Sequence, residues 1–231
     1  MRKFNYTRGK ELDLREEQEK TLKTPKHKAN IFLQVMFLVM DLCYGKKGSL
    51  LKFKALEMLA RYPYIAWENA SYHAITVAHS RPDYPKKETF DKALHLMRLG
   101  RDAQDNEQLH LMLIEDIMRQ NQIKQGWLQG YLIPHILSFG YYYLNTILYW
   151  LHPIWSFEMN AGLESHAEYE YMLAVREHPE WEEIPVESEY FQYYPKQKTL
   201  ADLMRRIALD ERDHRYRSLE EIDRLLNIIN G

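Results

Sequence analysis

Two pairs of the form Glu-x-x-His constrain this 231-residue chain more than any other feature. The pairs are Glu107-Gln-Leu-His110 and Glu211-Arg-Asp-His214, and each lies in a stretch whose apolar residues recur at helical spacing. Residues three apart lie on the same face of an α-helix, so both members of a pair can reach one metal ion. The pattern therefore predicts two helices whose metal-binding faces meet in a common interior.

A single glutamate on an otherwise apolar face precedes each pair. Glu57 lies in Lys-Ala-Leu-Glu-Met-Leu-Ala, and Glu164 lies in Ala-Gly-Leu-Glu-Ser-His-Ala. Four helices then carry Glu, Glu-x-x-His, Glu and Glu-x-x-His, which is the ligand order of a ferritin-like di-iron carboxylate bundle. Carboxylates and imidazoles suit iron or manganese, and ligands this few leave positions open for dioxygen. We expect two iron ions, held by Glu57, Glu107, His110, Glu164, Glu211 and His214.

Composition and length agree with an all-α fold of one domain. Gly and Pro number only nine each, and long periodic runs separate the few turn signals. At 45% hydrophobic residues the chain can bury one full core. We expect a mixed-charge N-terminal arm over residues 1–28, without the apolar core or cleavage pattern of a secretory signal, and a single helical-bundle domain over residues 29–231.

Charge and cysteine content exclude two other classes. The formal net charge is −2, and no run of Lys or Arg is interleaved with aromatic residues, so nucleic acid is not expected as a partner. Cys43 stands alone and cannot form an intrachain disulfide. A reducing compartment is therefore the default expectation.

The most unusual stretch is 125–157, which has 33 consecutive residues without Asp, Glu, Lys or Arg. As a helix, residues 134–152 would measure about 28 Å, close to the roughly 30 Å of bilayer hydrocarbon. A single crossing, however, would separate Glu107 from Glu164, although both must bind the same metal pair. Its many Tyr and Trp residues also favour the membrane boundary. We expect this stretch and the apolar helix at 31–42 to lie at the membrane surface; burial in the bundle or in a dimer face is the alternative.

At these motifs the chain resembles the alternative oxidases, and more closely their plastid terminal oxidase branch, over about residues 50–220. Residues 54–64, Lys-Ala-Leu-Glu-Met-Leu-Ala-Arg-Tyr-Pro-Tyr, are similar to that branch's Leu-Glu-x-Ile-Ala-Arg-Val-Pro-Tyr segment. The other similar stretches are Asn-Glu-Gln-Leu-His-Leu at 106–111, Leu-Glu-Ser-His-Ala at 163–167 followed by Tyr171, and Asp-Glu-Arg-Asp-His at 210–214.

The resemblance implies a homodimeric, membrane-bound enzyme. It would oxidise a membrane quinol, plastoquinol or ubiquinol, and reduce dioxygen to water without pumping protons, at a thylakoid or bacterial inner membrane. Tyr171 would lend an electron while the O–O bond breaks. Asn106 and Asp210, each directly before a ligand glutamate, would hydrogen-bond the ligands.

The expected quinol pocket departs from the family pattern. Lys52 stands where the family commonly has an arginine, which keeps the charge but loses the planar fork. Glu170 stands where a threonine is usual, whereas His166 matches the plastid branch. These three residues are expected to line the pocket. Two alternatives stay open from the sequence: a di-iron hydroxylase or desaturase acting on a lipid or quinone, and a non-catalytic iron-binding bundle.

Overall fold

The computed structural model describes residues 2–80 and 86–230, and within these ranges the regular structure is helical. This confirms the expected all-α fold. The α-helices are α1 (Leu14–Lys23), α2 (Ile31–Tyr44), α3 (Leu50–Ala60), α4 (Tyr62–His79), α5 (Lys87–Gln120), α6 (Ile133–Leu151), α7 (Pro153–Glu177) and α8 (Leu200–Asn230). Three short turns of helix, η1 (Leu128–Leu132), η2 (Pro179–Glu182) and η3 (Glu189–Gln192), lie in the connections.

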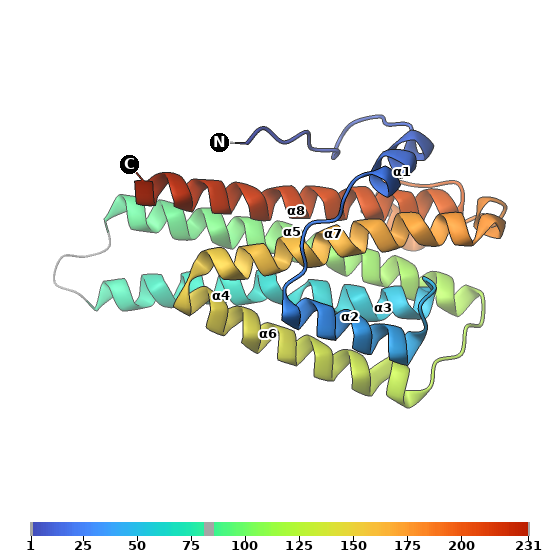
Figure 1. Cartoon of the computed structure of the whole chain (residues 1–231), viewed down its shortest axis with the longest axis horizontal. Helices are drawn as coiled ribbons and strands as arrows, with labels where there is room; N and C mark the ends of the chain where they lie inside the picture. Colours follow the sequence, from blue (N-terminus) through green and yellow to red (C-terminus); the bar gives the residue numbers. More distant parts are fainter. Residues whose placement is uncertain (1, 81–85, 231) are drawn as a thin grey trace.

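The bundle consists of α5, α7, α8 and the rod formed by α3 and α4, all running along the long axis of the molecule (Figure 1). Ser49 caps α3 by accepting a hydrogen bond from the backbone N–H of Lys52. The rod is interrupted at Arg61, and Pro63 lies in the first turn of α4. Proline is accepted there because the first N–H groups of a helix have no partner within it.

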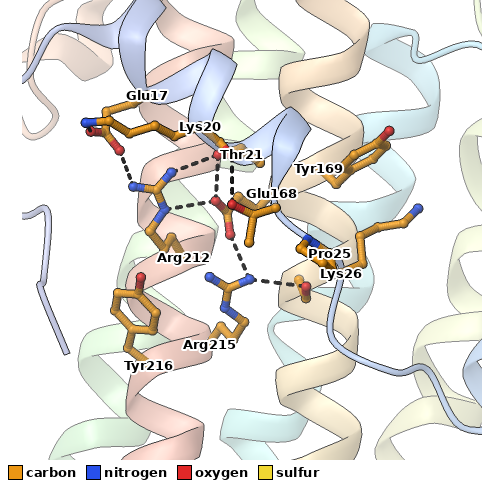
Figure 2. Close-up of a pocket in the computed structure, with 12 residues that line it drawn as sticks. Glu17, Lys20, Thr21, Pro25, Lys26, Glu168, Tyr169, Arg212, Arg215 and Tyr216 are labelled. Carbon is orange, nitrogen blue, oxygen red and sulfur yellow. Dashed lines mark hydrogen bonds and ion pairs between the residues drawn. The ribbon is translucent and has the colours of Figure 1, made fainter. Parts of the chain in front are cut away.

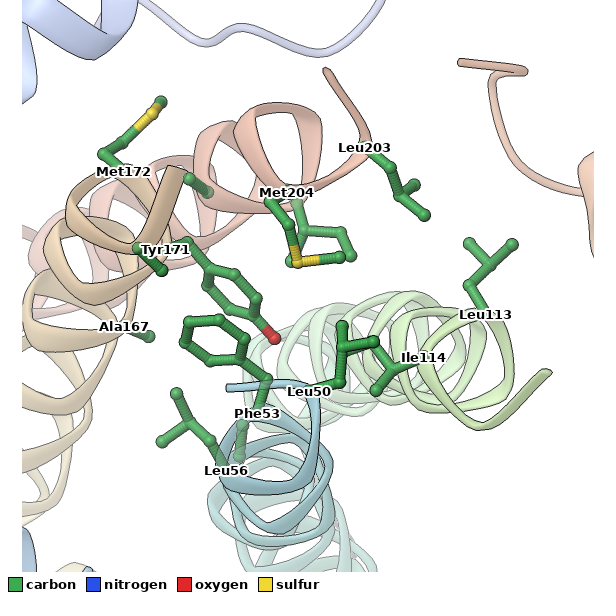
Figure 3. Packing of buried hydrophobic residues seen from close by; sticks show 14 of the residues in the cluster. Leu50, Phe53, Leu56, Leu113, Ile114, Ala167, Tyr171, Met172, Leu203 and Met204 are labelled. Atoms are coloured by element: carbon green, nitrogen blue, oxygen red, sulfur yellow. The ribbon is translucent and has the colours of Figure 1, made fainter. Parts of the chain in front are cut away.

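Two apolar clusters fill the bundle, one toward each end. The larger contains Phe53 of α3, Leu113 of α5 and Tyr171 of α7 together with residues 200–209 of α8 (Figure 3). The smaller contains Tyr64 and Trp67 of α4 with residues from α5, α7 and α8. On α5 and α8, residues 107, 110, 211 and 214 lie between the segments that belong to the two clusters. Glu57 and Glu164 directly follow Leu56 and Leu163 of the larger cluster. These six side chains are therefore enclosed in a low-dielectric interior.

Residues 2–28, expected as an arm, lie against α7 and α8, and polar contacts fix them there. Arg212 of α8 binds the carboxylates of Glu17 and Glu168, and it donates to the Thr21 hydroxyl at 2.8 Å (Figure 2). Thr21 also donates to Glu168 at 2.8 Å. Nearer the terminus, the buried Thr7 is bonded to Asp213. We call the Glu17–Thr21–Glu168–Arg212 group the arm clamp.

Helices α2 and α6 lie together along one side of the bundle, away from α1 and α8 (Figure 1). Between them runs an apolar groove of about 210 Å³, lined by residues such as Leu33, Met36 and Tyr141. Within the described ranges, no helix has the length and apolar content needed to span a membrane. We call the outward side of α2, η1 and α6 the α2–α6 apolar face. Each of its large apolar residues is at least half exposed: Ile31, Phe32, Val35, Leu38, Leu42, Leu128, Tyr131, Ile136, Phe139, Tyr143, Ile147, Trp150 and Leu151.

Candidate metal centre

The six side chains predicted as ligands come together at the middle of the bundle. Glu57 comes from α3, Glu164 from α7, and the Glu-x-x-His pairs come from α5 and α8. None of the six is more than 3% exposed. Ionisable groups are almost never buried this completely unless a partner or a metal ion compensates for the lost water.

The six form two overlapping groups, each able to hold one metal ion. One group is Glu57, Glu107, His110 and Glu211, and the other replaces Glu57 and His110 with Glu164 and His214. Within each group the ligand atoms lie within 4.8 Å of one another. Glu107 and Glu211 belong to both groups. Such carboxylates can bridge two ions, with one glutamate and one histidine at each end.

Unpaired atoms at the centre show that the site fits cations. Both carboxylate oxygens of Glu107 and of Glu211 are buried without a hydrogen-bond partner. Nδ1 of His110 lies 3.2 Å from Glu211 Oε1, yet that approach lacks hydrogen-bond geometry. Since buried polar groups are normally paired, this convergence of orphaned oxygen and nitrogen atoms matches a metal-ligand set. The remaining orphaned ligand atoms are Glu57 Oε2, Glu164 Oε2 and His214 Nδ1.

Electrostatics of the centre lead to the same conclusion. Burial, together with the negative charges of Glu107 and Glu211, raises the pKa of Glu57. Burial alone would lower the pKa of His214, but the carboxylates of Glu107 and Glu211 outweigh it and raise that pKa to about 9. Without a metal the centre thus retains protons on groups that normally lose them at neutral pH. Divalent cations would displace these protons and neutralise the carboxylates.

Asp210 lies beside one of the histidines. Its Oδ2 lies 3.3 Å from Nε2 of His110, so Nδ1 is left facing the centre. The Tyr194 hydroxyl donates to the same oxygen at 2.5 Å, and Arg206 pairs with the other oxygen. Asn106 is half-buried, and no hydrogen bond joins it to a ligand side chain within residues 2–80 and 86–230. Its role stays a prediction.

A tyrosine hydroxyl reaches each of the two unshared glutamates. Tyr171, predicted to work near the metals, donates to Glu57 Oε1, and its ring stacks on Phe53 at 4.0 Å between centroids (Figure 3). Tyr64 donates to Glu164 Oε1 at 2.6 Å. Tyr64 lies in the stretch 54–64, and sequence reasoning missed its contact with the centre. The signal was present, because Tyr64 follows Glu57 by seven residues, as Tyr171 follows Glu164.

Two of the three predicted quinol-pocket residues contact each other. Lys52 is buried, and its Nζ lies 2.7 Å from Asp41 Oδ1 and 3.4 Å from Glu170 Oε2. His166 stacks on Phe37 of α2 at 3.6 Å between centroids. Burial, with the nearby positive charges of Lys26 and Lys52, lowers the pKa of His166 to about 3, so its imidazole is neutral.

The helical bundle and its paired Glu/His groups define the class: a di-iron carboxylate protein of ferritin-like fold. Residues 10–220 match the model of the alternative oxidase family, and the chain belongs to that family. Alternative oxidases are non-haem di-iron quinol oxidases associated with membranes. This chain is accordingly an oxidoreductase whose cofactor is a pair of irons and whose substrates are quinol and dioxygen. No curated protein matches it.

Proposed function

We propose that this chain is a membrane-surface quinol oxidase of the plastid terminal oxidase type that reduces dioxygen to water without pumping protons. The observation that carries the proposal is the pair of ligand groups sharing Glu107 and Glu211. These two carboxylates would bridge the irons. Glu57 with His110, and Glu164 with His214, would complete the ends. A bound ferrous pair supplies electrons and open positions to dioxygen.

The quinol pocket would lie where Lys52 and Glu170 meet. Lys52 precedes Glu57 on α3, and Glu170 directly precedes Tyr171 on α7. A quinol hydroxyl placed at this ion pair is therefore within one or two helical turns of the side chains that face the centre. The ammonium group would orient the quinol oxygen. Once the Tyr171 phenol has given up one electron and its proton, the tyrosyl radical that remains would take a hydrogen atom from the quinol. The neutral His166 offers a further hydrogen-bonding group nearby.

The α2–α6 apolar face would rest on lipid. Its aliphatic and aromatic side chains are each at least half exposed, and exposed apolar side chains gathered on neighbouring helices are typical of a membrane-contacting surface. A lipid-soluble quinol could enter along the α2–α6 groove without crossing water. The expected site is a thylakoid or bacterial inner membrane, and the homodimer that the resemblance implies belongs to the same proposal.

Quinol-dependent oxygen uptake tests the activity. Detergent-purified, iron-loaded protein is assayed with short-chain plastoquinol and ubiquinol, beside Glu164→Ala and the matched control Glu158→Ala, an exposed glutamate on the same helix. We expect uptake in the original and the control, loss in Glu164→Ala, and quinone as the sole organic product. A hydroxylated product would instead support the hydroxylase alternative, and iron binding without turnover would support the iron-binding bundle.

Vesicle flotation tests the lipid contact. Leu38→Glu places a charge on the α2–α6 apolar face, and Phe90→Glu places one on an exposed apolar position of α5. A charge on a lipid-facing surface weakens interfacial binding. We expect Leu38→Glu to reduce flotation with anionic vesicles and Phe90→Glu to leave it unchanged. Equal flotation of both variants would contradict the placement.

A further inference from the structure

The centre has an approximate two-fold relation between its halves. Tyr64 and Tyr171 each follow an unshared glutamate by seven residues, which is two helical turns. Neither tyrosine bonds the glutamate of its own segment. Instead Tyr171 donates to Glu57, and Tyr64 donates to Glu164. The two segments thus exchange their tyrosines across the centre.

The equivalence extends to individual atoms. Each of the two glutamates accepts the phenol hydrogen bond at Oε1, and the Oε2 atom of each is buried without a hydrogen-bond partner. Both tyrosines are completely buried. The hydroxyl of Tyr64 is therefore connected to its end of the centre in the same way as that of Tyr171 is connected to the other.

Packing alone does not require a hydroxyl at position 64. The Tyr64 ring meets Trp67 edge-on at 5.1 Å and His214 at 5.6 Å, contacts that a phenylalanine ring would also make. Burying a phenol is unfavourable unless its O–H is bonded. The hydroxyl donates to Glu164 and accepts from Nδ2 of Asn160 at 3.0 Å. Both hydrogen bonds hold the phenol oxygen of Tyr64 in one position.

We propose that Tyr64 is a second redox-active tyrosine of the centre, equivalent to Tyr171 and serving the opposite end of the metal pair. This inference rests on the proposed function, because dioxygen is the oxidant. At each tyrosine the phenolic O–H bond breaks. One electron passes to dioxygen, one proton leaves through the carboxylate oxygen that accepts the hydrogen bond, and a neutral tyrosyl radical remains.

Two tyrosines complete the electron count. Reduction of dioxygen to two waters needs four electrons and four protons. A ferrous pair supplies two electrons on becoming ferric, and the two phenols supply two electrons and two protons. One quinol then returns a hydrogen atom to each radical, and a second quinol returns two electrons to the irons and two protons to the waters. Two quinols are oxidised to two quinones for each dioxygen.

Rapid-freeze electron paramagnetic resonance tests the proposal. Iron-loaded protein grown with ring-deuterated tyrosine is reduced with dithionite, mixed with dioxygen and frozen. The variants are Tyr64→Phe, Tyr171→Phe, the double variant, and Tyr72→Phe, an exposed tyrosine on the same helix as Tyr64. Phenylalanine keeps each ring in place. Iron content and circular dichroism of each variant verify loading and folding.

We expect a tyrosyl signal, narrowed by deuterium, in Tyr171→Phe, and its loss in the double variant. Tyr72→Phe should match the original protein. Absence of a radical from Tyr171→Phe, with iron content intact, would overturn the proposal and leave Tyr64 as a residue that positions Glu164. A radical that persists in the double variant would also overturn it. Because dithionite replaces quinol, missing quinol turnover with these radicals intact would count against the proposed function alone.

Discussion

Replacing a shared and an unshared glutamate separately tests how the metal ligands are divided. Glu107 belongs to both ligand groups, and Glu57 belongs to one. Glu107→Gln should therefore weaken both metal positions. Glu57→Gln should leave the other ligand group intact, and that group can still bind one ion. Its members are Glu107, Glu164, Glu211 and His214. Glutamine keeps the size of the side chain, and its carbonyl can still accept the Tyr171 hydrogen bond.

The size of the effect follows from mass action. A ligand at 100 times its Kd stabilises the folded state by about 2.7 kcal/mol per site, so two sites give about 5 kcal/mol. For a domain of this length, 1 kcal/mol shifts Tm by about 2–4 °C. Mn²⁺, which is stable to air, should raise the Tm of the original protein by roughly 10–20 °C. Glu57→Gln should retain about half of that shift, and Glu107→Gln almost none.

Thermal unfolding followed by circular dichroism, with and without Mn²⁺, measures these shifts, and metal analysis gives the ions bound per chain. Asp105→Asn, an exposed acid on the same helix as Glu107, is the matched control and should behave as the original. Equal shifts in Glu57→Gln and Glu107→Gln would refute the assignment of Glu107 as a bridging ligand. A full shift in both would refute the ligand set itself.

Three further perturbations have defined outcomes. In the metal-free protein, Tm should fall as pH rises from about 6.5 to 9. The folded state raises the pKa of His214 from 6.5 to about 9 and also raises that of Glu57, so it holds these protons more tightly than the unfolded state does. A Tm that does not change with pH in the presence of EDTA would contradict this. Arg212→Met removes one of the two guanidinium partners of Glu168 and leaves Arg215 Nη1 at 3.1 Å from the other carboxylate oxygen, so urea titration should show a loss of about 1–3 kcal/mol. Gly100→Ala would place a methyl group 2.9 Å from a backbone carbonyl of α4, and it should lower the free energy of unfolding by about 1–3 kcal/mol in the same titration.

The convergence of the six expected ligand side chains was predictable because its signal is local. A glutamate and a histidine three apart share a helical face whatever the rest of the chain does, and the apolar neighbours of Glu57 and Glu164 indicate buried faces. The helices follow from the same periodicity. Those patterns were sufficient to predict an all-α bundle with these six side chains at its centre.

The contacts around the centre were not predictable in this way. Tyr194 lies in the connection between η3 and α8, and only the folded chain brings its hydroxyl to Asp210. Which glutamate Tyr64 would reach depends on how α4 packs against α7. The polar anchoring of residues 2–28 was missed because hydropathy detects apolar surfaces, whereas the arm clamp consists of charges and hydroxyls.

The ligand groups combine residues from nearly the whole bundle, beginning at Glu57 and ending at His214. Each group takes side chains from α5 and α8 together with α3 or α7, so neither can assemble from a local segment. Contacts between distant segments form late, after the entropy of closing long loops has been overcome. Metal capture should therefore follow folding and not guide it. In a cell, iron occupancy would distinguish completed molecules from partly folded ones, and iron scarcity would leave a folded but inactive reserve.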